Sequence, residues 1–531
     1  MSLDEQAEIA GRDGGLLKSS AVVGAMTMLS RVLGLLRDVV IAVFIGATAN
    51  ADAFFVAFKV PNFLRRLFAE GAFSQAFVPV LAEYRESGSR DAVRALIDRV
   101  AGVLGGSLMM LTLLMVAGAP VVTAVFAPGF VRDPAKYAIT VEMIRVTFPY
   151  LFLISMTGFC GAILNSYGRF AVPAFTPVWL NLSLISAALF ASPWFTDPAY
   201  ALAWGVMMAG IVQLLFQLPF LYKLDLVPRP RWDTQHPGVR QIGKLMLPAL
   251  FGVSVSQINL LLDTVLASFL PTGSVSWLYY SDRLTELPLG VFGIAIATVI
   301  LPRLSRLQAG ADGHRFAETL DWAMRGVLLI GLPASIALLV LAEPILTSLF
   351  QYGALEASDV TMASLSLRAY CLGLLAFMLV KVLAPGFYAR QDMVTPVRIG
   401  IIAMIANMVM NLAFVVPLYL YFNIGHVGLA LATSLSAWLN AGLLLRGLRR
   451  TDVLTFQAGW GRFLLRLCLA TLAMAAALWW LLPEAPAWQA WAWWQRALEL
   501  AQLVAAGLAA YLISHLLLGT RLADFYTQKA G

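Results

Sequence analysis

Ionisable side chains stand within four long apolar segments of this sequence, at about residues 17–45, 51–82, 242–270 and 275–302. Each segment is long enough to cross a bilayer, where a charge that faces lipid at the centre costs about 2.5–3.5 kcal/mol or more. A dozen such charges facing lipid would exceed the stability of a typical fold, so they must face one another or water. They are Arg31, Arg37, Asp38, Asp52, Lys59, Arg65, Arg66, Glu70, Asp263, Asp282, Arg283 and Glu286.

The spacing of these residues predicts that they share helix faces. Arg31 and Asp38 are seven residues apart, which places them on one stripe of a helix. The side chains of Lys59, Asn62, Arg66 and Glu70 follow the same helical period in the second segment, and Asp282 and Glu286 are four apart.

Two interpretations fit this pattern. Cations and anions could form neutral ion-pair networks that hold the helices together, since the two signs are about equal in number. Alternatively, the segments line a hydrated cavity in which Arg31, Arg37, Lys59, Arg65 and Arg66 outnumber the acids at mid-membrane depth. Because guanidinium groups bind phosphate in a bidentate manner, we favour a cationic cavity for an anionic, phosphorylated substrate. Some acids, such as Glu70 and Asp282, would then be structural partners.

A small-cation site is a second candidate. Asp263, with Asn407 and Asn411 spaced four apart on another segment, could offer oxygen ligands to sodium. Asparagines inside membrane helices more often form hydrogen bonds between helices, and both interpretations stay open here.

The whole sequence has 531 residues, of which 60% are hydrophobic and only 13% charged. A soluble domain is nearer half apolar and a quarter charged. The composition therefore excludes a cytosolic globular enzyme, a disordered scaffold and a disulfide-rich secreted domain, and predicts an all-α polytopic membrane protein. We expect about fourteen transmembrane helices, at 17–45, 51–82, 95–118, 138–166, 172–192, 199–222, 242–270, 275–302, 320–342, 360–388, 396–418, 427–446, 461–482 and 496–518.

The net charge of +7 is typical of cationic cytoplasmic loops in a membrane protein rather than of nucleic-acid binding. One set of alternate connections carries most of the arginines that lie between the segments, among them Arg169, Arg303 and Arg390, and the positive-inside rule makes this set cytoplasmic. An even number of helices then places both termini in the cytoplasm. The three cysteines and four histidines are scattered, which supports neither disulfides nor a zinc site.

An internal repeat divides the segments. "FVPVLAEY" at the end of the second segment resembles "ILPRLSRL" at the end of the eighth, and Tyr167-Gly-Arg169 before Pro173 resembles Tyr388-Ala-Arg390 before Pro396. We predict two pseudo-symmetric six-helix lobes with two helices appended at the C-terminal end. The expected parts are a cytoplasmic tail at 1–16, an N-lobe at 17–225, a cytoplasmic linker at 226–241, a C-lobe at 242–450, and the last two helices with a tail at 451–531. Transporters with two such halves bind substrate between them.

The same segments resemble the MurJ/MviN family, the lipid II flippases of the MOP transporter superfamily. The resemblance is densest in "MTMLSRVLGLLRDVVIA", "DAFFVAFKVPNFLRRLFAEGAFSQAFVPVLAEY", "GSVSWLYYSDRLTELPLGVFGIAIATVILPRLS" and "VKVLAPGFYARQDMVTPV". It implies alternating-access transfer of lipid II, the undecaprenyl-pyrophosphoryl-MurNAc-pentapeptide-GlcNAc precursor of peptidoglycan, from the cytoplasmic to the outer leaflet of the bacterial inner membrane. It also implies that the last two helices form a groove for the polyprenyl tail.

By motif, the resemblance implies that the arginines required for function are Arg31, Arg37, Arg65 and Arg283. Asp52 and Glu70 match other sensitive positions, and Asp263 matches a position proposed for sodium coupling. Asn411 stands where some members have a carboxylate, which is a departure from the family pattern. The expected partners are lipid II, membrane lipids and other cell-wall synthesis proteins, with sodium or the membrane potential as energy source and no other cofactor.

Other functions make different demands on the sequence. A cation-coupled exporter of another anionic lipid-linked glycan or small molecule is the main alternative, and a drug exporter would favour acidic and aromatic cavity residues over arginine. An enzyme acting on polyprenyl phosphates would need a dense acidic or histidine motif in one loop, and a channel fits two lobes around one cavity poorly. We find neither such a motif nor a Gly-rich phosphate loop, so we expect a transporter and not an enzyme.

Overall fold

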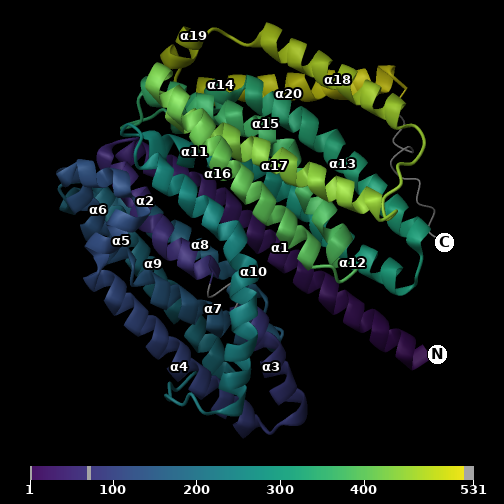
Figure 1. The fold of residues 1–531 in the computed structure, drawn as a ribbon. Helices are drawn as coiled ribbons and strands as arrows, with labels where there is room; N and C mark the ends of the chain where they lie inside the picture. The colour runs from purple at the N-terminus through teal and green to yellow at the C-terminus, as the bar shows by residue number, and fades with distance from the viewer. Residues whose placement is uncertain (1–2, 68–72, 520–531) are drawn as a thin grey trace. The chain divides into compact units, whose positions relative to one another are not determined.

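The structure, a computed structural model, describes residues 3–67 and 73–519. These residues form helices joined mostly by short connections (Figure 1). The chain divides into two compact units, Met1–Gly273 and Ser274–Gly531.

Among the residues that the structure describes, the first unit contains ten α-helices, π-helical turns at 66–67 and 73, and three further short turns of other helix types. Within it α1 contacts α8, α7 contacts α9, and α2 contacts α6. The α-helices are α1 (Leu3–Ile45), α2 (Ala49–Arg65), α3 (Ser74–Ser87), α4 (Arg90–Ala117), α5 (Ala119–Phe126), α6 (Pro134–Thr147), α7 (Tyr150–Ser166), α8 (Ala171–Ser186), α9 (Pro198–Lys223) and α10 (Pro237–Ala267), and the short turns are η2 (Pro128–Arg132), η3 (Ala187–Ala191) and η4 (Ser192–Trp194).

The second unit contains the remaining helices. Here α15 contacts α13 and α17, while α18 packs on α20 and on α13. The helices are α11 (Ser274–Pro288), η5 (Leu289–Gly293), α12 (Ile294–Ala309), α13 (Gly313–Val340), α14 (Ala342–Phe350), α15 (Ala357–Tyr388), α16 (Val394–Phe422), α17 (Gly425–Arg450), α18 (Trp460–Leu481), α19 (Ala485–Ala490) and α20 (Trp493–Leu517).

Ten helical stretches among the described residues are long and apolar enough to cross a membrane. This confirms the all-α polytopic fold class. The other four of the fourteen predicted segments, at 17–45, 51–82, 242–270 and 275–302, are the four that carry the charged side chains. The second and eighth of the fourteen segments are divided into helices of 14 to 17 residues, α2 and α3 in one and α11 and α12 in the other, each shorter than the ~20 residues that cross a bilayer. The count of fourteen stays a prediction, as do the boundaries of the two six-helix lobes.

Two of these four charged segments are interrupted at corresponding places. In the second predicted segment π-helical turns occupy residues 66–67 and 73, between α2 and α3. In the eighth segment the π-helical turn η5 joins α11 to α12. A π turn adds one residue to a helical turn and often lies at a functional site. Its presence in both segments fits the predicted repeat.

Helix starts are fixed by the residues that precede them. The Thr48 side chain accepts a hydrogen bond from the backbone N–H of Ala51 and so caps α2. Asp133 and Asp197 cap α6 and α9 in the same way, each followed by a proline at the first helical position. The caps at Thr48 and Asp133 fix the first residues of α2 and α6, and so determine which way Asp52 and the residues of α6 face.

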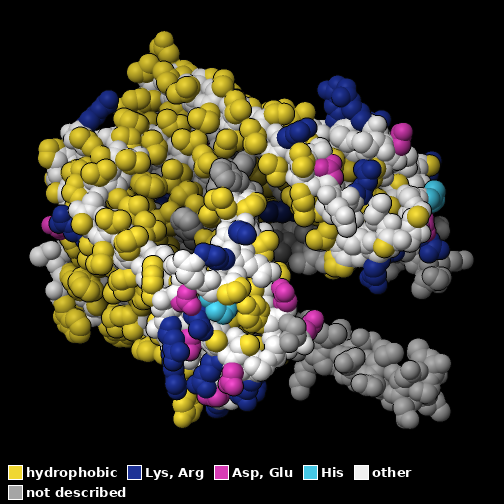
Figure 2. All heavy atoms as spheres, turned by 60° about the horizontal axis from the view of Figure 1, so that its bottom comes forward, with side chains coloured by type: hydrophobic (Ala, Val, Ile, Leu, Met, Phe, Trp, Pro, Cys, Tyr) yellow, Lys and Arg dark blue, Asp and Glu magenta, His cyan; other side chains and the backbone are white. Residues whose placement is uncertain are grey.

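Packing between helices relies on close approach, because lipid offers no hydrophobic driving force between apolar helices. A β-carbon added at Gly373 of α15 would lie 2.6 Å from the Cα of Ser434 on α17. The Ser434 hydroxyl in turn donates to the carbonyl of Ala369 at 2.7 Å. Large hydrophobic side chains such as Leu114, Val409 and Leu465 are exposed, and Figure 2 shows hydrophobic side chains over much of the surface it draws. Such a surface is suited to lipid.

The connection between α9 and α10 is held along α4. The carboxylate of Asp98, which is buried, accepts the backbone N–H of Arg229 at 2.8 Å, and the Asp98 carbonyl accepts that of Arg231 at 3.0 Å. The Arg99 guanidinium donates to the Asp233 carboxylate at 2.9 Å and holds the pKa of that carboxyl below its usual range. The segment predicted as a cytoplasmic linker is therefore fixed to the first unit by hydrogen bonds and an ion pair.

Candidate functional site

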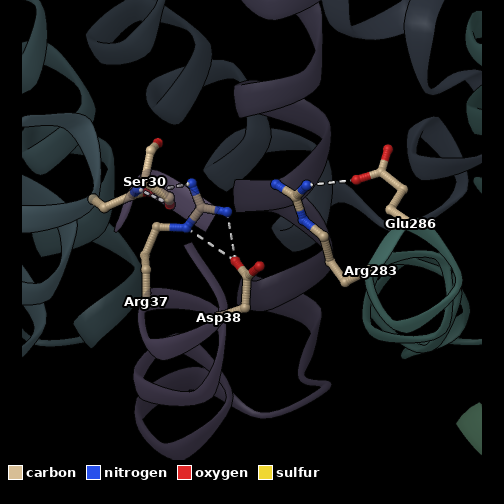
Figure 3. A network of polar contacts seen from close by, with 6 residues as sticks. Ser30, Arg37, Asp38, Arg283 and Glu286 are labelled. Carbon is tan, nitrogen blue, oxygen red and sulfur yellow. Dashed lines mark hydrogen bonds and ion pairs between the residues drawn. The ribbon is translucent and has the colours of Figure 1, made fainter. Parts of the chain in front are cut away.

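Arg37 and Asp38 form a buried ion pair on α1 (Figure 3). Two guanidinium nitrogens of Arg37 donate to the same Asp38 oxygen, at 2.9 and 2.6 Å. A third nitrogen donates to Oδ1 of Asn181 on α8 at 3.1 Å, and Asn181 donates to the backbone carbonyl of Ser30 at 3.0 Å. Arg37 and Asp38 are only 4% and 2% exposed. The pair therefore ties α1 to α8, and an anionic substrate would compete with Asp38 for the same guanidinium.

Arg31 lies further into α1 and is half-buried. At ~1.5 Å rise per residue, Arg31 and Arg37 are roughly 21 and 12 Å from the end of α1 at Ile45. The two arginines are thus spread along the axis of one helix rather than gathered at one depth.

Asp52 is fully buried at the start of α2. Its Oδ2 accepts the Lys136 ammonium, from the first turn of α6, at 2.7 Å, and the backbone N–H of Gly273 at 2.8 Å. The Lys136 ammonium also lies 4.2 Å from the centre of the Phe130 ring. The structure places Asp52 in an internal ion pair that joins α2 to α6 and to the end of the unit, and its predicted contact with substrate stays a prediction.

The next residues of α2 are more accessible. Lys59 is half-buried and donates to the hydroxyl of Thr264 on α10 at 3.2 Å. The Asn62 amide donates to the carbonyl of Phe58 at 2.9 Å and accepts from Nε of Arg65 at 3.2 Å. Arg66, just beyond the end of α2, is exposed, and Glu70 lies outside the described residues.

In the second unit, Arg283 of α11 forms an ion pair with Glu286, one helical turn on, at 2.8 Å (Figure 3). The guanidinium also lies 5.4 Å from the centre of the Tyr279 ring. The side chains of Arg283 and Glu286 are 31% and 44% exposed, and Asp282 is half-buried. This partly exposed arginine contrasts with the buried Arg37.

The predicted sodium ligands belong to both units, Asp263 to α10 of the first and Asn407 and Asn411 to α16 of the second. Both asparagines are fully buried, and Asn411 donates to Oδ1 of Asn407 at 3.0 Å. Asn407 donates to the hydroxyls of Thr433 and Ser436 on α17 at 3.4 and 3.5 Å. This is the arrangement of hydrogen bonds between helices, and sodium would need the Asn407 oxygen that Asn411 now uses. The sodium site stays a prediction.

Within the described residues no group of three or more histidines, cysteines or acids could hold a metal ion. Sequence reasoning did not predict three partners of the site residues, Lys136, Asn181 and Thr264. Lys136 carried a signal, because it lies between the predicted segments 95–118 and 138–166, in a connection that is not among the arginine-rich cytoplasmic ones. Asn181 is a lone amide in an apolar segment, and only its position beside α1 gives it a role.

These features define the class of protein as a multi-pass helical membrane protein with charged side chains inside four of its long segments. Residues 41–494 match the model of the family described as lipid II flippase MurJ. A probable lipid II flippase MurJ from Vibrio cholerae is 54% identical over 96% of this chain and 97% of the relative. One from Haemophilus influenzae is 50% identical over 93% of this chain and 98% of the relative. The chain belongs to the MurJ family, which confirms the resemblance drawn from its motifs.

Solved structures share the fold. A lipid II flippase MurJ in an inward closed conformation matches with a TM-score of 0.78 at 24% identity, over 93% of this chain and 98% of that one. An inward-facing multidrug resistance MATE family transporter of the MOP superfamily matches with a TM-score of 0.65 at 16% identity, over 82% of this chain and 98% of that one. The fold is therefore one that transporters use.

Proposed function

We propose that this protein is a lipid II flippase, which moves the undecaprenyl-pyrophosphate-linked peptidoglycan precursor from the cytoplasmic to the outer leaflet. The observation that carries the proposal is the identity of 54% over 96% of the chain with a probable lipid II flippase. The most similar solved fold described above is also that of a lipid II flippase, whereas the multidrug transporter shares less of the chain.

The chemistry of the charged segments fits this substrate. A pyrophosphate is a poor solute for the bilayer interior, and guanidinium groups are suited to bind it through paired hydrogen bonds. Arg65 and Arg283 are partly exposed, and we assign them to direct contact with the anion. Arg31, Lys59, Asn62, Arg66, Glu70, Asp282 and Glu286 remain further candidates for substrate contact. Arg37 and Asp52 are buried in ion pairs, so we assign to each the role of positioning its helix before any contact with substrate.

Transport would proceed by alternating access, with the headgroup in a cationic path and the polyprenyl tail in lipid beside α18 and α20. The positive-inside rule supports cytoplasmic termini, and the match to the lipid II flippase family supports a bacterial inner-membrane location. Binding, transfer and release need no bond to be broken, so we propose a transporter and not an enzyme. Lipid II and membrane lipids are the direct partners, and enzymes that make or use lipid II are the further ones.

The charge that is moved with the substrate indicates how transport could be driven. Moving one net charge across the membrane changes its free energy by about 2.3 kcal/mol per 100 mV. A cation-lined path that carries a diphosphate therefore responds to the membrane potential. A sodium ion at Asp263, Asn407 and Asn411 would be the second route of coupling.

The test uses the purified chain in lipid vesicles that contain lipid II in both leaflets. An enzyme that consumes lipid II is added outside, and the fraction that it reaches is followed over time. We expect the protein to make the inner pool accessible while a fluorescent phospholipid stays protected. Equal protection of lipid II with and without protein, or equal release of both lipids, would reject the proposal.

A further inference from the structure

A cavity of about 710 Å³ lies within the first unit, among α2, α3, α7, α8 and α9. Binding sites for small molecules commonly span ~300–1,000 Å³. Two of the lining residues, Tyr150 and Asn165, are roughly 22 Å apart along α7 at ~1.5 Å per residue. The cavity is therefore longer than a single sugar ring or a single phosphate.

Buried amides and a hydroxyl form one wall of this cavity. Gln217 of α9 is 1% exposed, and its Nε2 donates to the hydroxyl of Thr176 on α8 at 2.9 Å. Gln213 donates to the backbone carbonyl of Thr176 at 3.2 Å and accepts the Tyr150 hydroxyl at 3.4 Å. These bonds fix the amide of Gln217, so its remaining oxygen has a defined direction.

The Oε1 oxygen of Gln217 is buried and has no hydrogen-bond partner among the residues that the structure describes. An unsatisfied buried acceptor costs about 1–3 kcal/mol. A β-carbon added at the neighbouring Gly161 would lie 3.7 Å from the Gln217 amide nitrogen and 3.4 Å from Pro173. The missing side chain at Gly161 thus leaves room for one atom beside the amide nitrogen of Gln217.

The remaining described lining is neutral apart from Arg65. Apolar walls come from Phe170, Pro173, Pro177 and Leu180. Phe170 directly follows Arg169, whose connection is predicted to be cytoplasmic. One guanidinium, several uncharged hydrogen-bonding groups and flat apolar faces suit a ligand with one anionic part and a neutral, hydroxyl-rich part.

We propose that this cavity binds the N-acetylated sugars of the lipid-linked substrate, with the pyrophosphate at Arg65 and a sugar hydroxyl or acetamido N–H donating to Oε1 of Gln217. The inference rests on the proposed function and adds a glycan subsite to it. The proline and phenylalanine side chains pack against the apolar faces of the sugar rings. The site would therefore distinguish a lipid pyrophosphate that carries sugars from one that does not.

The test compares two ligands on the purified full chain, lipid II and undecaprenyl pyrophosphate without sugars. Gln217→Leu keeps the volume of the side chain and removes both its donor and its acceptor. We expect it to weaken lipid II binding about five- to tenfold, the value of one hydrogen bond, and to leave undecaprenyl pyrophosphate binding unchanged. Arg65→Ala should weaken the binding of both ligands.

Two further variants make the result decisive. Gly161→Ala adds one carbon at ordinary contact distance and should also weaken only lipid II binding. Ser155→Ala removes a buried hydroxyl of α7 outside the cavity lining and should change neither. Equal losses for both ligands, or unchanged lipid II binding in both Gln217→Leu and Gly161→Ala, would overturn the glycan subsite. If the unmodified chain binds neither ligand, the proposed function itself fails.

Discussion

Replacement of Asp52 by asparagine should destabilise the first unit strongly. The side chains of Asp52 and Lys136 are 1% and 5% exposed, and their charged atoms are 2.7 Å apart. Without the carboxylate, the Lys136 ammonium stays buried with no opposite charge, and breaking a buried pair in this way costs about 3–5 kcal/mol. At about 2 cal/mol/K of unfolding entropy per residue over the 273 residues of the unit, this lowers the thermal midpoint by roughly 5–9 °C.

The assay follows the reaction of thiols with a fluorogenic maleimide during heating, in a chain whose Cys371 and Cys468 are replaced by alanine. The remaining thiol, Cys160, is buried in the first unit and becomes reactive on unfolding. The matched control is Asp225→Asn. Its carboxylate pairs with Arg94 at 3.2 Å but is 63% exposed, and such surface pairs contribute about 0–1 kcal/mol. The double variant Asp52→Asn with Lys136→Met removes both buried charges and should recover most of the loss.

The same variants separate structure from substrate contact at Asp52. If Asp52 only positions α2, the double variant should regain lipid II transport to the same extent as it regains thermal stability. Lost transport in a fully stable double variant would instead place Asp52 at the substrate. Asp52→Asn with a thermal midpoint no lower than that of Asp225→Asn would refute the reasoning about the buried pair.

Two predictions concern the connection between α9 and α10, which is hydrogen-bonded to α4. A β-carbon at Gly102 would overlap the backbone of Arg231, so Gly102→Ala should expose the Arg231–Trp232 bond to cleavage by trypsin. The control is Gly105→Ala, where the added carbon lies at ordinary distance from Met156 and cleavage should not increase. Equal cleavage of the two variants would contradict this prediction. The Asp233 carboxyl has a pKa below its ordinary value of 3.8 because Arg99 donates to it, so the stability it adds is fully present above that value and is lost as the pH falls through the lowered pKa. The rate of amide hydrogen exchange in this connection, corrected for its intrinsic pH dependence, should therefore rise as the pH falls through the lowered pKa. Asp233→Asn should show this faster exchange already above pH 3.8. Exchange in Asp233→Asn equal to that of the unmodified chain would argue against a stabilising Arg99–Asp233 pair.

Composition and helical period predicted much of this molecule. High hydropathy identified the all-helical membrane fold, and the four segments that carry buried or half-buried charges were found by the cost of charge in lipid. The predicted stripe of Lys59, Asn62 and Arg66 lies on one helix or at its end, since local spacing determines which residues share a face.

Partners could not be predicted in the same way. Arg37 pairs with its direct neighbour Asp38 and with Asn181, which is 144 residues away. Lys136 reaches Asp52 only because α6 packs against α2. Such contacts depend on tertiary packing, which one sequence does not reveal. The same holds for Gln217, which with Gln213 is one of two amides in an apolar helix and gains a role only when the cavity beside them is seen.

The measurement that tests the central claim most directly is the exposure of lipid II at the outer leaflet of cells that depend on this protein. Arg31, Arg37, Arg65 and Arg283 are each replaced by alanine and by lysine, with protein levels matched. We predict that alanine abolishes exposure at Arg65 and Arg283 and that lysine restores it only in part, because it keeps the charge but loses the paired hydrogen bonds. Unchanged exposure in all of the alanine variants would contradict the account.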